Sequence, residues 1–219
     1  MTEPEPTVDV ILPCLDEAAA LPGVLHGLPA GYRAIVVDNG SSDGSADVAA
    51  ACGAKVVTEP RRGYGAAVHT GLEHATADVV CVLDADGSLD PAELPALVAL
   101  VLPHTLAVGS RNPVRRGVWP WHARLGNRLL ALLLRRRGVP VTDIGPVRAA
   151  RRDDLLTLGV RDRGFGYPLE ILLRAAAAGW TITEAEVAYH ARAAGTKSKV
   201  SGSIRGTLRA IRDMARVLR

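Results

Sequence analysis

The chain of 219 residues is 48% hydrophobic and 22% charged, an ordinary globular balance that excludes a disordered or fibrous protein. No stretch approaches the roughly 18 uninterrupted apolar residues of a membrane span, and the polar N-terminus lacks the order of a signal peptide. The 3 cysteines include no Cys-x-x-Cys pair, which favours a reducing compartment over disulfides or zinc. We therefore expect one cytoplasmic domain whose core is mainly aliphatic.

The net charge of +3 is unevenly divided along the chain. Residues 1–190 hold 18 basic against 22 acidic side chains, whereas residues 191–219 hold eight basic side chains and a single acid, Asp213. A basic tail on an acidic domain indicates an anionic partner for the tail. Aromatic residues do not interleave with its arginines, so we do not expect a nucleic-acid partner.

Strands and helices alternate through the first half of the chain. Apolar runs predict strands over residues 8–13, 34–38, 54–57, 78–83 and 106–109. Helical patterns fall between them, over residues 18–28, 45–52, 66–75 and 91–102. This alternation is typical of right-handed βαβ units, and it predicts an α/β fold with a mostly parallel twisted sheet flanked by helices.

The pattern changes after residue 110. Helices are predicted over residues 122–137, 166–178 and 203–219, a turn over 143–146 followed by a short strand, a strand over 181–189, and a basic loop over 193–203. The first of these helices has an apolar face of Leu125, Leu129, Leu132 and Leu133. Trp119 and Trp121 flank a proline just before it, which is typical of a loop anchor or of a membrane interface.

The last predicted helix is strongly amphipathic. Its apolar stripe consists of Ile204, Leu208, Ile211, Ala215 and Leu218. A second stripe consists of Arg205, Arg209, Arg212, Arg216 and Arg219. Such a helix more often packs its apolar stripe on the domain, here on the sheet. The alternative is attachment to an anionic membrane surface, which each basic residue near the surface favours by about 1 kcal/mol.

Two carboxylates one residue apart, Asp84 and Asp86, follow the apolar run at residues 79–83. Ligands of open α/β sheets bind beyond the carboxyl ends of the strands, and Gly87 lets the backbone turn there. Hard oxygen ligands at such an edge suit Mg²⁺ or Mn²⁺ carrying a diphosphate. The alternative is a polar turn in which Asp86 caps a helix that begins near Pro91.

Acidic residues follow three of the predicted strands at one edge of the sheet. They are Asp16 and Glu17 after the first strand, Asp38 at the end of the second, and the pair Asp84 and Asp86. Together they indicate a nucleotide cleft, because carboxylates suit ribose hydroxyls, base N–H groups and a metal ion. Gly63-x-Gly65 lacks the third glycine of a dinucleotide fingerprint, and residues 15–18 lack a basic, glycine-rich phosphate loop. These two absences argue against a dehydrogenase and a nucleotidyltransferase.

Five short motifs in a fixed order carry a resemblance to a known family. They are Leu12-Pro13-Cys14-Leu15-Asp16-Glu17, Val36-Val37-Asp38-Asn39-Gly40-Ser41-Ser42-Asp43-Gly44, Gly63-Tyr64-Gly65-Ala66-Ala67, Asp84-Ala85-Asp86-Gly87 and Gly109-Ser110-Arg111. The chain resembles family 2 glycosyltransferases of the GT-A fold. Within them it is most similar to the dolichyl- or polyprenyl-phosphate mannose synthases, whose Gly-x-Ser-Lys signature resembles residues 195–202. The resemblance covers residues 8–202.

The resemblance implies a set of donor-binding positions. They are Pro13, Leu15, Glu17, Asp38, Gly65, Asp84, Ala85, Lys197 and Lys199. Among them, Asp38 would hold the base and Asp84 would face the ribose and diphosphate. Asp86 would be the main ligand of Mg²⁺ or Mn²⁺. The two lysines would belong to a mobile loop that closes over the donor diphosphate.

On the acceptor side, the resemblance implies that Arg111 and Arg124 bind an acceptor phosphate. The chain departs from the subgroup at Ser88, where relatives often have a glutamine as a further metal contact. It departs again at residues 191–194, where relatives usually have a proline and more basic residues. It also ends without the C-terminal membrane helices that many relatives carry.

The implied reaction breaks the bond between a sugar and a nucleoside diphosphate. A divalent cation, Lys197 and Lys199 would stabilise the negative charge that builds on the diphosphate, and attack from the opposite face gives inversion. A lipid phosphate is already ionised and needs no general base, whereas a sugar hydroxyl needs a carboxylate to take its proton. Asp143 and Glu170 are the candidates, although Glu170 can instead pair with Arg174 one helical turn later.

We therefore expect a single GT-A domain over residues 1–219, with a nucleotide-sugar-binding half at 1–110, an acceptor half and mobile loop at 111–202, and the basic helix at 203–219. The expected function is metal-dependent, inverting transfer of a hexosyl group from GDP-mannose or a UDP-hexose to polyprenyl phosphate. The expected catalytic residues are Asp86, Arg111, Arg124 and Asp143. A peripheral contact with the inner, anionic face of the membrane fits this acceptor. The alternatives are a soluble glycosyltransferase with a hydroxyl acceptor and a non-catalytic nucleotide-sugar-binding module.

Overall fold

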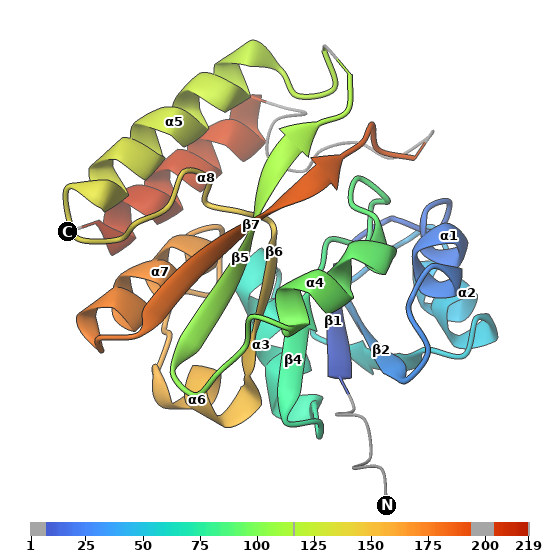
Figure 1. The fold of residues 1–219 in the computed structure, drawn as a ribbon. Coiled ribbons are helices and arrows are strands. Elements are labelled where there is room, and N and C mark those ends of the chain that lie inside the picture. The colour runs from blue at the N-terminus through green and yellow to red at the C-terminus, as the bar shows by residue number, and fades with distance from the viewer. Residues whose placement is uncertain (1–7, 116, 194–203, 219) are drawn as a thin grey trace, which may run out of the picture.

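The structure is a computed structural model that describes residues 8–115, 117–193 and 204–218. This part of the chain forms a 7-stranded sheet in the order β3-β2-β1-β4-β6-β5-β7, with helices on both faces (Figure 1). The strands are β1 (Val8–Cys14), β2 (Tyr32–Asp38), β3 (Lys55–Thr58), β4 (Val79–Val82), β5 (Thr105–Pro113), β6 (Val147–Arg151) and β7 (Thr181–Tyr189). The predicted α/β fold with a mostly parallel sheet flanked by helices is confirmed.

One strand of the sheet, β6, runs against the others. β1 pairs in parallel with β2 and β4, β2 with β3, and β5 with β7. β6 lies between β4 and β5 and is antiparallel to both. The carboxyl ends of β1, β2, β4, β5 and β7 therefore meet at one edge of the sheet. Periodicity predicts a short strand after residue 146 but carries no information about its direction.

The helices are α1 (Leu21–His26), α2 (Ser45–Ala51), α3 (Tyr64–His74), α4 (Leu94–Val98), α5 (Trp121–Arg135), α6 (Arg152–Thr157), α7 (Tyr167–Ala177) and α8 (Ile204–Val217), with a 3₁₀ turn, η1 (Pro91–Glu93). Two predicted helices are shorter than expected, and prolines explain both. α1 begins at Leu21 and not at residue 18, because Pro22 lies in its first turn, where no helical N–H is needed. Pro95 has the same place in α4, so the helix predicted over 91–102 divides into η1 and α4 and ends at Val98.

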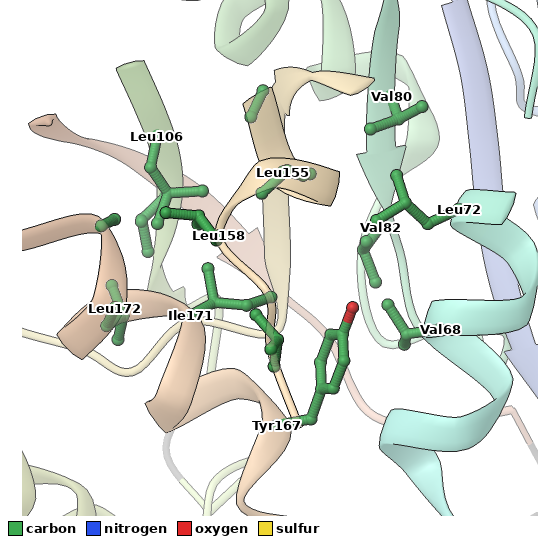
Figure 2. Packing of buried hydrophobic residues seen from close by; sticks show 14 of the residues in the cluster. Val68, Leu72, Val80, Val82, Leu106, Leu155, Leu158, Tyr167, Ile171 and Leu172 are labelled. Carbon is green, nitrogen blue, oxygen red and sulfur yellow. The ribbon is translucent and has the colours of Figure 1, made fainter. Parts of the chain in front are cut away.

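The core has two layers, one on each face of the sheet. Ile11 of β1 faces the layer that α3, α6 and α7 cover, whereas its neighbours Val10 and Leu12 face the layer that α1, α2 and α4 cover. In β4, Val80 and Val82 point into the first layer, toward α3 and α7 (Figure 2). Strands buried on both faces read as continuous apolar runs, which is why they were predicted reliably.

The C-terminal ends of α5 and α8 lie close together beyond this core (Figure 1). Just after α5, Arg137 Nη2 donates a hydrogen bond of 3.0 Å to the carbonyl oxygen of Leu218, which follows α8. The predicted apolar face of α5 does not pack inward. Its members Leu125, Leu129, Leu132 and Leu133 are all exposed, and Ala131 and Leu134 are buried in their place.

The last helix, α8, also turns an unexpected face inward. It packs against α7 and the turn at residues 164–166, not against the sheet as predicted. Ala210 and Asp213 are buried, whereas Leu208 and Ile211 of the predicted apolar stripe are exposed. Close packing explains the difference. Gly164 and Gly166 of that turn lie directly against Asp213, whose Oδ2 accepts a hydrogen bond of 3.3 Å from Phe165 N. Only a short side chain fits so close to the backbone.

Candidate functional site

The loops that follow β1 and β2 are tied together at the carboxyl edge of the sheet. Asp16 N donates to Ser41 Oγ at 3.0 Å. Asp38, the last residue of β2, accepts hydrogen bonds from the N–H groups of Gly40 and Ser41 at 3.2 and 3.1 Å. Asp38 therefore lies at the expected edge, and it also fixes the turn that follows its own strand.

Asn39 joins a third loop, the one that follows β3, to the loops after β1 and β2. We call these loops at the carboxyl edge of the sheet the rim. Its Nδ2 donates to the carbonyl oxygens of Glu59 and Arg61 at 2.8 and 2.9 Å. Its Oδ1 accepts a hydrogen bond of 2.8 Å from Gly63 N. Both donors and the acceptor of this amide are used, so the rim is rigid between β2 and α3.

Asp84 and Asp86 follow β4 at this edge. Asp86 is buried, and its Oδ1 accepts a hydrogen bond of 2.9 Å from Ser88 N, which closes a tight turn. The alternative in which Asp86 caps the next helix is wrong, because Asp90 takes that place and accepts a hydrogen bond of 2.9 Å from Ala92 N. The helix cap and the buried carboxylate are thus separate residues.

A segment after β7 lies across the turn that carries Asp86. His190 N donates to the carbonyl oxygen of Ser88 at 2.8 Å, and Ala193 N donates to that of Asp86 at 3.1 Å. Within this segment, Arg192 Nη1 lies 2.5 Å from Asp86 Oδ2. The guanidinium of Arg192 therefore occupies one side of the carboxylate that was expected to bind a cation.

The positive charges near Asp84 and Asp86 do not fully compensate the negative charges of the two carboxylates. Burial, and then the neighbouring negative charge of Asp86, raise the pKa of Asp84 to about 7. The positive charges of Arg192, Arg111 and Arg148 oppose this shift only in part. An additional cation beside the two carboxylates would restore the charge balance.

The two carboxylates suit a divalent cation that is shared with a substrate. Mg²⁺ typically takes one or two protein carboxylates and completes its shell with substrate phosphates and water. In the described part of the chain, no cluster of three or more His, Cys, Asp or Glu side chains could hold a metal ion by itself. Asp84 and Asp86 therefore fit a cation that arrives with a diphosphate, and they do not form a closed structural metal site.

On the other side of the edge, Arg111 near the end of β5 is held by Asp143. Arg111 Nε and Nη2 donate to Asp143 Oδ2 and Oδ1 at 2.8 and 2.7 Å, a bidentate fork, and Arg111 N donates to Oδ2 at 2.9 Å. Burial alone would raise the pKa of Asp143, but these bonds and the arginine charge outweigh it and hold that pKa below its usual range. Asp143 is therefore an ionised partner of Arg111.

Two aromatic rings complete the surroundings of Arg111. Its guanidinium carbon lies 3.9 Å from the centroid of the Trp119 ring and 5.6 Å from that of Tyr189. The fork uses the edge of the guanidinium formed by Nε and Nη2, which leaves Nη1 outside it. Arg111 thus has one fixed orientation, with cation–π support from Trp119.

Close packing of two glycines brings Asp143 and Arg111 together. Gly109 of β5 approaches Val147 so closely that a Cβ atom would lie 2.2 Å from Val147 Cγ1. Gly145 has φ +62, and a Cβ atom there would lie 2.7 Å from the carbonyl oxygen of Gly109. The turn at 143–146 can pass over β5 at this distance only because both residues lack side chains.

The remaining predicted donor positions lie on the rim or beneath it. Pro13 and Leu15 are partly buried, and Glu17 and Ala85 are buried. Gly65 lies against Tyr167, and its N–H donates to the carbonyl oxygen of Gly164 at 3.0 Å. Close packing accounts for that glycine, and its contact with a donor stays a prediction.

The other predicted residues divide between the acceptor side and the scaffold. Arg124 is exposed on α5, one turn before Asn127, whose Oδ1 accepts a bond of 3.4 Å from Arg111 Nη2. Lys197 and Lys199 lie outside the described residues. Glu170 forms the structural pair that the sequence allowed, because Arg174 Nε lies 2.6 Å from its Oε1.

Several residues around the site were not singled out from the sequence. Arg192 was noted only as part of a departure, and the stacking of Trp119 and Tyr189 on Arg111 was not predicted. Arg148 is fully buried in β6, and its charge acts on Asp84. An arginine between the apolar residues Val147 and Ala149 of a short strand was the one signal that could have drawn attention to it.

Comparison with known proteins decides the family. The model of glycosyl transferase family 2 matches residues 9–159. The chain belongs to glycosyltransferase family 2. An uncharacterized glycosyltransferase of Mycobacterium tuberculosis is 55% identical over 213 residues, which is 96% of this chain and 97% of the relative. The undecaprenyl-phosphate mannosyltransferase of Micrococcus luteus is 32% identical, over 90% of this chain and 88% of the relative.

Solved structures of other glycosyltransferases share the fold. A glucosyl-3-phosphoglycerate synthase from Mycobacterium tuberculosis, crystallised with Mn²⁺, UDP and glucosyl-3-phosphoglycerate, superposes with a TM-score of 0.73. It is 26% identical, and the match covers 98% of this chain and 79% of that one. The family 2 chain described here is therefore a glycosyltransferase with a GT-A architecture.

Proposed function

We propose that this glycosyltransferase moves a hexosyl group, with inversion, from GDP-mannose or a UDP-hexose to polyprenyl phosphate. The observation that carries the proposal is the Arg111–Asp143 fork, which offers an oriented guanidinium at the same edge of the sheet as Asp84 and Asp86. A phosphate acceptor and a cation-bound diphosphate would each find a suitable partner there. The name of the Micrococcus relative, an undecaprenyl-phosphate mannosyltransferase, supports this acceptor.

The donor would bind to the half of the domain at residues 1–110, with Asp38 toward the base. Mg²⁺ or Mn²⁺ would be held by Asp86 and Asp84 together with the donor diphosphate, and it would neutralise charge on the leaving diphosphate. The structural relative crystallised with UDP and Mn²⁺ supports this class of donor and cofactor. Lys197 and Lys199 are proposed to approach the same diphosphate.

The acceptor would bind to the half at residues 111–202, with its phosphate on Arg111 and Arg124. A phosphate oxygen attacks the anomeric carbon, and the bond from that carbon to the diphosphate oxygen breaks with its electron pair. The acceptor oxygen is already ionised at neutral pH, so no proton has to be removed. The task of the two arginines is to hold the phosphate in line with the breaking bond.

This assignment gives Asp143 a positioning task. Both of its oxygens accept hydrogen bonds from Arg111, and its pKa lies below its usual range, so it stays ionised and engaged. The second candidate base, Glu170, is equally occupied, because it accepts hydrogen bonds from Arg174 and from the N–H groups of residues 161 and 162. These contacts favour an acceptor that needs no base.

A polyprenyl phosphate is held in a membrane, so the proposal includes a peripheral contact with the cytoplasmic, anionic face of one. Across the described ranges, no helix has both the length and the hydropathy needed to cross a bilayer. We propose that surface side chains make this contact, with the basic tail as the first candidate.

The second candidate function is transfer to a hydroxyl acceptor. One observation favours it: the structural relative at 26% identity is named for a phosphoglycerate acceptor, which carries both a hydroxyl and a phosphate. Arg111 would suit the phosphate of such an acceptor as well as it suits a lipid phosphate. The two candidates differ in whether the product retains a lipid.

The test is product analysis with the purified chain. It is incubated with Mn²⁺, GDP-mannose or UDP-glucose, and either a short-chain polyprenyl phosphate or 3-phosphoglycerate. We expect a hexosyl lipid phosphate, with the rate lowered by about 10² or more in Asp86→Asn. Arg111→Lys should raise the acceptor KM by about tenfold or more, whereas the exposed control Arg151→Lys should leave it unchanged. Exclusive transfer to 3-phosphoglycerate, or donor binding without any product, would overturn the proposal.

A further inference from the structure

Within the described residues, α5 carries an exposed apolar stripe. Its members are Trp121, Leu125, Leu129, Leu132 and Leu133, which are between 41% and 76% exposed. The opposite side of the helix is the one that packs, since Ala131 and Leu134 are buried. At 3.6 residues per turn the five exposed side chains share one face, so the stripe is continuous along the helix. A soluble monomer rarely exposes so many large apolar side chains in one place.

The neighbouring helix α8 repeats this arrangement. Leu208 and Ile211 are 61% and 59% exposed, whereas Ala210 is buried on the inner side. The C-terminal ends of the two helices meet, because Arg137 just after α5 donates a hydrogen bond to the carbonyl oxygen of Leu218 just after α8. We call the exposed residues of α5 and α8 together the two-helix face.

The polar part of the two-helix face is almost purely basic. Its exposed arginines are Arg124, Arg128 and Arg135 on α5 and Arg209, Arg212 and Arg216 on α8. The α5 sequence contains no acidic residue. The single acid of α8, Asp213, is buried on the inner side, with Arg212 Nε and Arg216 Nη1 at 3.7 and 3.8 Å from its Oδ1. On α5 the arginines lie between the leucines and the buried side, at the height where a helix lying in an interface meets lipid phosphates.

We propose that the two-helix face docks this protein on an anionic lipid bilayer, with its leucines in the acyl boundary and its arginines on the phosphates. This inference deepens the proposed function and rests on it for its biological purpose. The two-helix face begins at Trp121, two residues after Trp119, whose ring stacks on the guanidinium of Arg111. Docking would therefore present the acceptor side of the site to the membrane that holds a lipid phosphate.

A second copy of the chain is the other occupant to consider. In a symmetric dimer the same patch meets itself, so the α5 arginines of two copies would face each other with no acidic residue on that helix to pair with. Charge complementarity therefore favours lipid over self-association. The experiment below includes the dimer as an outcome that contradicts the inference.

The experiment is sedimentation of the full chain with vesicles of phosphatidylcholine alone or with about one third phosphatidylglycerol. We expect binding to the anionic vesicles, with at least a tenfold loss in the double variant Leu129→Ser, Leu132→Ser and a similar loss in Arg128→Ala, Arg135→Ala. The matched controls are Leu102→Ser, at a leucine that is 65% exposed elsewhere, and Arg151→Ala, at an exposed arginine on β6. Thermal unfolding of each variant checks that the fold is retained.

Equal binding to both vesicle types, or unchanged binding in both double variants, would overturn the inference. So would a dimer in analytical ultracentrifugation that dissociates in Leu129→Ser, Leu132→Ser. Transfer assays separate this failure from failure of the proposed function. Leu129→Ser, Leu132→Ser should keep transfer to a water-soluble short-chain lipid phosphate and lose transfer to a long-chain acceptor in vesicles. Vesicle binding without transfer to any lipid phosphate would support docking and reject the proposed acceptor.

Discussion

Arg192 Nη1 lies 2.5 Å from Asp86 Oδ2, in a segment that also donates a backbone hydrogen bond to the carbonyl oxygen of Asp86. The guanidinium takes the position next to the carboxylate where a divalent cation would bind. If Asp86 holds the cation as proposed, Arg192 and the cation compete for it, and the arginine would have to turn away, or the segment after β7 to move, on cation binding. The prediction that follows is specific to the chain without donor.

Arg192→Ala should bind Mn²⁺ more tightly than the wild type in the absence of nucleotide. A partly buried charged pair contributes about 0.5–1.5 kcal/mol, which corresponds to an affinity increase of about two- to tenfold. Electron paramagnetic resonance titration of free Mn²⁺ measures it directly. Arg192→Lys keeps the charge and should stay close to the wild type. Weaker Mn²⁺ binding in Arg192→Ala would mean that the arginine helps to hold the cation.

The stability of the metal-free protein should fall as the pH rises from about 4 to about 7. The pKa of Asp84 is raised from 3.8 to about 7 by burial and by Asp86, so in this range the folded chain keeps a proton that the unfolded chain has lost. In EDTA, Asp84→Asn should therefore have a higher Tm than the wild type at pH 8, by at least about 2 °C. The two proteins should converge below about pH 4, where Asp84 is protonated in both the folded and the unfolded wild type. Equal Tm values at pH 8 would show that the carboxylate is not strained by its surroundings.

Asp143→Asn should impair the acceptor side without changing the shape of the pH profile. The variant loses the charge that orients Arg111, so the acceptor KM should rise while the donor KM stays the same. Because the pKa of Asp143 lies below its usual range, the carboxyl is ionised throughout pH 6–9 and contributes no limb to the rate profile. Asp153→Asn, at an exposed carboxylate, is the control. A wild-type limb that disappears in Asp143→Asn would identify the residue as a base.

Gly109→Ala should destabilise the fold by about 1–3 kcal/mol, because the new methyl group overlaps Val147 and pushes the turn at 143–146 away from β5. The same displacement should raise the acceptor KM. The matched control is Gly126→Ala on the outer side of α5, where the added Cβ meets nothing within 4 Å. That control should be more stable by about 0.5–1 kcal/mol, as expected for Gly to Ala in a helix. Chemical denaturation of the three proteins gives the comparison.

Glu170→Gln should lose stability and keep its turnover. Burial would raise the pKa of Glu170, but hydrogen bonds from residue 162, Arg174 and residue 161 lower it below its usual range. The stabilisation is therefore present above pH 4.5 and is lost as the pH falls through the lowered pKa, so the two proteins should become equally stable in strong acid. At pH 7 the expected loss is about 1–3 kcal/mol. A large fall in kcat at unchanged stability would instead make Glu170 part of the chemistry.

Most of the fold followed from the sequence because buried strands are easy to recognise. Runs such as residues 79–83 are apolar on both faces, and acidic or glycine residues follow them, so both the strands and the edge at which they end could be predicted. The direction of β6 could not, since a short strand reads the same in either direction. The helix ends were misjudged where Pro22 and Pro95 set the true first turn.

Residues of the candidate site could be predicted where they end or directly follow a strand. They could not be predicted where only the packing of an irregular segment brings them to the site. Asp84, Asp86 and Arg111 lie at the expected edge because each follows or ends a recognisable strand. Arg192 enters from a segment with no regular pattern. The inward face of α8 was misjudged, because periodicity reports which side of a helix is apolar, whereas the small side chains that allow close contact decide which side packs. The apolar face named for α5 is likewise not the side that packs.

Asn39 and Gly40 form an Asn-Gly pair, which deamidates readily in flexible chains. The backbone nitrogen of the glycine attacks the side-chain amide of the asparagine, and ammonia is released. In this protein the Gly40 N–H donates to Asp38, and the Asn39 amide is held by three hydrogen bonds. Conversion of Asn39 to an aspartate would place a negative charge against the two carbonyl oxygens that its amide now serves. Deamidation of Asn39 should therefore limit how long the protein can be stored. Samples kept partly unfolded should deamidate at Asn39 first.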